Sequence, residues 1–87
     1  MNWVGEVISK ELKAFGMTQL QLAEKSHLTA AHISWIINGR CKITVDTASK
    51  IASALPALSA RELLIIQLDY ELEKYEKETE LIHQRFQ

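Results

Sequence analysis

Apolar residues in this 87-residue chain recur every three or four positions, in short stretches with sharp boundaries. Most stretches follow a threonine or serine, and most stop near a glycine or proline. Spacings of three and four place side chains on one face of an α-helix, whereas a strand alternates at every second residue. Ser and Thr cap helix N-termini, and Gly ends helices because it adopts the left-handed conformation readily. The pattern therefore predicts an all-α fold.

These boundaries predict five helices joined by short connections. The expected starts are residue 2 and the capping residues Thr18, Thr29, Thr44 and Ser59. The expected ends are Phe15 before Gly16, the turn Ser26-His27-Leu28, Asn38-Gly39, Pro56 and about Phe86. Gln21 and Glu62 complete capping boxes with Thr18 and Ser59, since each follows its partner by three residues. We expect His27 to adopt a left-handed conformation in its turn.

One apolar face of each helix is expected to form the core. In the first four helices this face consists of Val4, Ile8, Leu12, Phe15, Leu22, Ala23, Ile33, Ile36, Ile37, Ala48, Ile51, Ala52 and Leu55. A short stripe near the start of the last helix is suited to packing on it: Leu63, Ile66 and Tyr70.

Composition argues against several classes of protein. The single cysteine, Cys41, excludes an internal disulfide and fits a reducing cytoplasm. No stretch approaches the roughly 20 apolar residues of a membrane span, and the N-terminus lacks the features of a signal peptide. There is no glycine-rich phosphate loop, nucleophile elbow or metal-spaced His/Cys set. We therefore expect a cytoplasmic protein that is not an enzyme, contacts no membrane, and needs neither cofactor nor metal.

The net charge of −1 conceals an uneven distribution of charge. Residues 1–55 carry six basic and four acidic side chains, whereas residues 56–87 carry four basic and seven acidic ones. A mildly basic first part followed by an acidic helix is compatible with one face that meets phosphates, although it does not require one.

The second and third expected helices, joined by a turn of three or four residues, match a helix-turn-helix. In this motif one helix braces across the DNA backbone and the next lies in the major groove. Ala23 provides the small residue where the two helices cross. Apolar residues that would lock the pair are Leu22, Leu28, Ile33 and Ile36. The pattern favours a DNA-reading unit within residues 18–40 over a plain helical hairpin.

Two segments carry a resemblance to a known family: Thr18-Gln19-Leu20-Gln21-Leu22-Ala23-Glu24-Lys25, and Ile33-Ser34-Trp35-Ile36-Ile37-Asn38-Gly39-Arg40. With Leu28 between them, they resemble the signature of the Cro/CI (xenobiotic-response-element) helix-turn-helix family. Gly5-Glu6, Lys42-Ile43-Thr44 and the segment from Leu64 to Leu72 resemble its HigA-type antitoxin branch. The likeness covers about residues 5–75. It implies a five-helix, repressor-like DNA-binding domain with a long C-terminal helix.

The resemblance places Gln19 and Asn38 at phosphate contacts, where amide groups are suitable donors. Arg40 and Lys42, just past the third helix, would add positive charge to the same contact. The expected phosphate-contact set is Thr18, Gln19, Asn38, Arg40 and Lys42. The expected base-reading face is Ala30, Ala31, His32, Ser34 and Trp35.

This face departs from the family, whose members usually place Arg, Gln, Ser or Thr at several of these positions. Alanines offer only contact with thymine methyl groups, and His32 and Ser34 each offer a hydrogen bond of limited specificity. Specificity could therefore rest on DNA shape and half-site spacing. Two alternatives stay open: Trp35 is partly buried or contacts protein, and His32 is merely solvated.

The last helix carries a second apolar stripe at alternating spacings of three and four, which is a heptad pattern. We expect its members to mediate dimerisation: Ile65, Leu68, Leu72, Tyr75, Ile82 and Phe86. The alternative is a helix folded back on its own domain. The expected division is a DNA-binding domain of residues 1–58 and a dimerisation helix of residues 59–87.

The resulting hypothesis is a homodimeric transcriptional repressor that binds double-stranded DNA at a short palindromic operator. A second function remains open, that of an antitoxin that neutralises a small toxin and autoregulates its operon. A toxin protein would then be a further partner.

Overall fold

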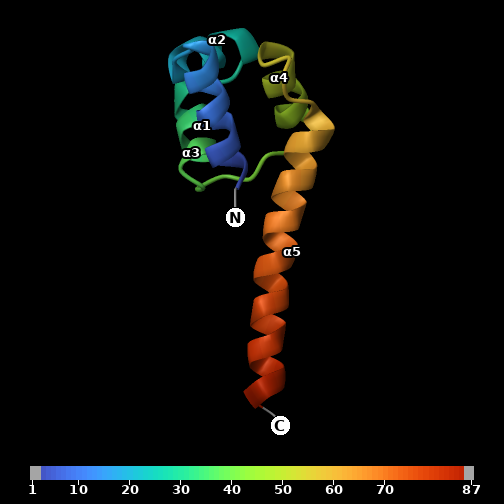
Figure 1. The fold of residues 1–87 in the computed structure, drawn as a ribbon. Coiled ribbons are helices and arrows are strands. Elements are labelled where there is room, and N and C mark those ends of the chain that lie inside the picture. Colours follow the sequence, from blue (N-terminus) through green and yellow to red (C-terminus); the bar gives the residue numbers. More distant parts are fainter. Residues whose placement is uncertain (1–2, 86–87) are drawn as a thin grey trace.

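The computed structural model describes the backbone of residues 3–85 and the side chains of residues 3–77. Within this part of the chain there are five α-helices and no strand (Figure 1). The helices are α1 (Val4–Phe15), α2 (Gln19–Ser26), α3 (Ala30–Ile37), α4 (Val45–Ala54) and α5 (Ala60–Arg85). The predicted all-α class is confirmed.

The helix boundaries arise from the local signals in the sequence. The side chains of Thr18, Thr29 and Thr44 each accept a hydrogen bond from the backbone amide three residues further on. Ser59 does the same for the amide of Glu62, at 3.0 Å. Gly16 ends α1 in the left-handed conformation, with φ at 65°. Each of these predicted caps is confirmed.

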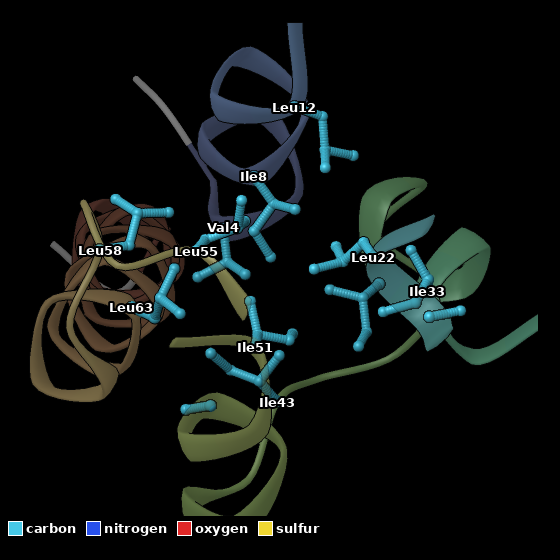
Figure 2. Close-up of a cluster of buried hydrophobic side chains, with 13 residues drawn as sticks. Val4, Ile8, Leu12, Leu22, Ile33, Ile43, Ile51, Leu55, Leu58 and Leu63 are labelled. Carbon is cyan, nitrogen blue, oxygen red and sulfur yellow. The ribbon is translucent and has the colours of Figure 1, made fainter. Parts of the chain in front are cut away.

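The core lies where α1, α2, α3, α4 and the start of α5 meet. Figure 2 shows apolar side chains from all of these elements turned toward one another. The buried set is Val4, Ile8, Leu12, Leu22, Ala23, Ile33, Ile36, Ile43, Ala48, Ile51, Leu55, Leu58 and Leu63. Ile37, Ala52 and Ile66 are half-buried. Ile43 and Leu58 were not predicted, because they lie in connections where helical periodicity gives no signal.

Three expectations about individual residues are wrong. Tyr70 was assigned to the stripe of α5 that packs on the core, but it is 38% exposed and lies beyond the part of α5 packed there. Phe15 was assigned to the core, but it is 57% exposed, because this last residue of α1 borders a surface pocket with Lys25 and Pro56 instead of packing among the buried side chains. Ser26 was assigned to the turn, but it is the last residue of α2 and is fully buried. Burial of its hydroxyl is tolerated because Oγ donates a hydrogen bond to the carbonyl of Leu22 at 2.6 Å.

Helix α1 packs directly against the C-terminal end of α3 at Gly5, which is buried. A Cβ at this position would lie 2.6 Å from the Ile36 carbonyl oxygen and would also clash with that of Ile37. The absence of a side chain therefore sets how closely α1 approaches the end of α3.

Helix α5 begins at Ala60, contributes Leu63 to the core, and then runs away from the other four helices (Figure 1). The molecule is consequently elongated, with extents of 52, 23 and 22 Å along its principal axes. Among the described residues, no helix is long and apolar enough to cross a membrane.

Candidate DNA interface

The N-terminus of α2 exposes the first two residues of the predicted phosphate-contact set, Thr18 and Gln19. Thr18 forms the complete capping box with Gln21: its Oγ1 accepts from the Gln21 amide at 3.1 Å, and its own amide donates to Gln21 Oε1 at 2.9 Å. The capping box holds the start of the helix in place. Because a helix N-terminus carries partial positive charge, this end of α2 suits contact with an anion.

The turn between α2 and α3 holds the two helices in a fixed relation. His27 lies in the left-handed conformation with φ at 60°, as predicted. The amide of Leu28 then donates to the carbonyl of Ala23 at 3.0 Å. Ala23 and Leu22 are buried, and Leu28 packs against the core. The structure thus has a three-residue turn between packed helices, which is a helix-turn-helix.

Helix α3 turns one face to the core and the opposite face to solvent. Ile33 and Ile36 are buried, and helical spacing puts Ala31, Trp35 and Asn38 on the opposite side, where all three are exposed. Trp35 is 50% exposed, so part of its surface is covered within this chain and the rest is available for contact with DNA or protein. Ala30, at the first turn, is exposed as well.

The two polar members of the predicted base-reading face are less free than the alanines. Ser34 is half-buried, and its Oγ accepts a hydrogen bond from Asn38 Nδ2 at 3.3 Å. His32 is also half-buried, with Nε2 3.7 Å from the sulfur of Cys41. His32 is therefore not a fully solvated side chain, and its ring links α3 to the loop that follows it.

That loop, residues 38–44, carries the two cations of the predicted phosphate-contact set. Gly39 has φ at 74°, and the amide of Arg40 donates to the Trp35 carbonyl at 2.8 Å, so the chain turns back tightly at the end of α3. Arg40 is exposed. Lys42 forms an ion pair with Glu71 of α5, at 3.0 Å between Nζ and Oε1.

Two residues of α5 that hold this loop were not anticipated from the sequence. Besides Glu71, the side-chain amide of Gln67 forms two hydrogen bonds to the backbone of Ile43. Helical periodicity identifies apolar faces, so it gave no signal for polar contacts between α5 and a distant loop.

The described part of the heptad stripe is exposed. Ile65, Leu68, Leu72 and Tyr75 have between 47% and 68% of their surface accessible. Leu68, Leu72 and Tyr75 also border a groove of about 610 Å³ that extends to Trp3 and Lys42. The side chain of Ile82 and the whole of Phe86 lie outside the described residues. The described segment of α5 therefore projects from the core with an uncovered apolar face.

The fold and this surface define a helix-turn-helix unit of the kind that reads DNA. The chain belongs to the Cro/CI-type helix-turn-helix family, whose model matches residues 8–63. Members of this family are DNA-binding regulators, which confirms the predicted family and the coarse functional class. The likeness to the HigA-type branch stays an interpretation of the sequence.

A solved structure described as a hypothetical protein from E. coli has a similar fold, with a TM-score of 0.83. It is 21% identical in sequence, and the match covers 99% of this chain and 88% of that chain. At this level of identity the likeness shows the fold alone, long α5 included. No curated protein matches the chain.

Proposed function

We propose that the protein is a homodimeric transcriptional repressor that binds a short palindromic operator. The observation that carries the proposal is the exposed face of α3 in a helix-turn-helix, with exposed Arg40 immediately beyond its C-terminal end. In this motif the second helix enters the major groove, so α3 would present Ala31 and Trp35 to the bases.

The chemistry of this face predicts modest direct readout. Ala30 and Ala31 can contact only thymine methyl groups, and Ser34, whose Oγ accepts from Asn38, has a single O–H left to donate to a base. A single protomer would therefore gain most of its affinity from phosphate contacts, which carry no sequence information. Discrimination between sites would come from DNA shape and from the fixed distance between two half-sites.

The exposed stripe on α5 supports a dimer. An uncovered apolar row that includes Leu68 and Leu72 is costly in water, and a second copy of the same stripe would cover it. Pairing would also hold two α3 helices about one DNA turn apart, which a palindrome requires.

Selection of bound DNA from a random pool tests the proposal. We expect enriched sequences to contain inverted half-sites centred about 10 base pairs apart, or a multiple of that distance. A pool without enrichment would contradict sequence-specific binding. Enrichment of single, unpaired half-sites would contradict the dimer.

A second candidate function is that of an antitoxin that neutralises a small toxin and autoregulates its operon. The groove beside Trp3 supports it, because this partly apolar surface does not include Ala31 or Trp35 of the exposed α3 face and could be covered by another protein. The same groove borders Lys42 and the heptad stripe, so a protein bound there would compete with the dimer. Expression of small reading frames adjacent to the gene, with and without this protein, is the test. Toxicity relieved by the protein would support the candidate, and the absence of any toxic neighbour would reject it.

A further inference from the structure

The loop between α3 and α4 contains a buried residue outside any helix. Ile43 is 3% exposed, and its side chain belongs to the core. Burial removes its backbone amide and carbonyl from water as well, and such groups need hydrogen-bond partners within the protein. How these two groups are bonded therefore determines where the loop lies.

A single side chain of α5 bonds both groups. The Ile43 amide donates to Gln67 Oε1 at 2.7 Å, and Gln67 Nε2 donates to the Ile43 carbonyl at 2.9 Å. A primary amide carries an acceptor and donors on one rigid plane, so it can mimic the edge of a neighbouring strand. We refer to this pair of hydrogen bonds as the Gln67 clamp.

The clamp lies next to the cations of the loop. Lys42 directly precedes Ile43 in the chain, and Arg40 lies three residues before it. The backbone amide of Arg40 itself donates to the Trp35 carbonyl of α3 at 2.8 Å. The short segment that carries both cations is thus attached to α3 at one end and to α5 at the other.

We propose that Gln67 is a positioning residue for DNA binding, whose side-chain amide holds the loop so that Arg40 and Lys42 meet the phosphate backbone. The inference rests on the proposed function, because it assigns these cations to DNA. It extends that function by making the phosphate contact of each protomer depend on α5, the helix assigned to dimerisation.

Gln67→Met tests the inference, because methionine keeps the length, flexibility and helix propensity of glutamine but cannot form either hydrogen bond. The probe is a duplex of about 30 base pairs enriched from a random pool by the wild-type protein. Affinity is measured between about 50 and 200 mM salt, where each phosphate contact contributes about 0.9 to the slope of log K against log salt. Ser53→Ala is the control: it removes a side-chain hydrogen bond to the Lys50 carbonyl in α4, away from the loop.

We expect Gln67→Met to remain a folded dimer, to bind the duplex about tenfold more weakly at low salt, and to show a slope shallower by about one to two. Ser53→Ala should match the wild type. A slope equal to that of the wild type would overturn the inference, whether or not affinity falls, because a loss of stability alone does not change the number of phosphate contacts.

Two further measurements keep the outcomes separate. If Gln67→Met does not fold, Gln67→Glu replaces it, since the carboxylate keeps the shape and can accept from the Ile43 amide but cannot donate to the carbonyl.

If the wild type binds no duplex, the proposed function fails on its own. Exchange of the Ile43 amide, measured without DNA, then decides the clamp: equal rates in wild type and Gln67→Met would overturn it.

Discussion

Single residues in this chain differ in how well their structural role can be predicted from the sequence. The threonine caps and left-handed His27 were predictable because a cap or turn involves residues only three or four positions apart. Phe15 was misassigned because its spacing fits the apolar face of α1, whereas its exposure depends on which other elements reach that end of the helix. Gln67 could not be predicted, since its partner is 24 residues away and no periodicity connects them.

Gly5 provides a prediction at this scale in which two effects have opposite signs. Alanine is a better helix former than glycine by about 1 kcal/mol, so propensity alone predicts that Gly5→Ala stabilises the protein. The contact with the carbonyls of Ile36 and Ile37 leaves no room for a Cβ. We expect the steric effect to dominate and the free energy of unfolding to fall by about 1–3 kcal/mol.

Urea unfolding followed by circular dichroism measures this change. Lys13→Ala, an exposed substitution on the same helix, is the control and should alter stability by less than about 0.5 kcal/mol. A Gly5→Ala protein more stable than the wild type would show that α1 can move away from α3 at little cost.

At the scale of helices and loops, the helix-turn-helix was predictable because its two helices, caps and turn are contiguous in sequence. The loop after α3 was predictable only in composition: its cations were recognised, but not their attachment to α5. The structure shows that Lys42, assigned to DNA, is paired with Glu71. Two predictions about charge follow from this geometry.

The first prediction concerns the cations themselves. Arg40→Ala combined with Lys42→Ala should weaken binding to all DNA sequences alike, because phosphate contacts carry no sequence information. The slope of log K against log salt should become shallower by about two. Gel-shift titrations at several salt concentrations measure both. Unchanged affinity and slope would place the backbone contact elsewhere on the protein.

The second prediction concerns Glu71, whose carboxylate would compete with a phosphate for Lys42 in the proposed DNA contact. The Lys42 side chain is 79% exposed, so the ion pair is weak and can exchange for a phosphate. We expect Glu71→Gln to raise DNA affinity by about two- to fivefold. Glu73→Gln is a matched control, since it removes the same charge from α5 at a residue paired instead with Lys77. Equal gains in both variants would indicate a general effect of net charge.

At the scale of the whole molecule, the sequence predicted a long last helix but not its direction. Its heptad pattern fits a helix that pairs with a partner and also one that folds back on its own domain. In the structure α5 leaves the core after Leu63 and contributes to an elongated shape with Leu68 and Leu72 exposed, so its described part does not fold back on its own domain. Pairing with a partner stays a prediction. Pairing involves a second chain, so no property of one protomer can establish it.

Leu68→Glu combined with Leu72→Glu tests the pairing directly. Buried carboxylates facing one another across a twofold interface would be costly, so we expect monomers in sedimentation equilibrium. When one protomer of a dimer is bound, the other is held at a high effective concentration near the second half-site, so the dimer binds a palindrome more tightly than a monomer does. We therefore expect the monomeric variant to bind a palindrome about a hundredfold more weakly while keeping its affinity for a half-site. Val45→Glu, on the first turn of α4, replaces another exposed apolar residue, 69% exposed and outside the stripe, and should remain dimeric. If the double variant stays dimeric, the interface lies on another surface, and α5 positions the loop without joining the protomers.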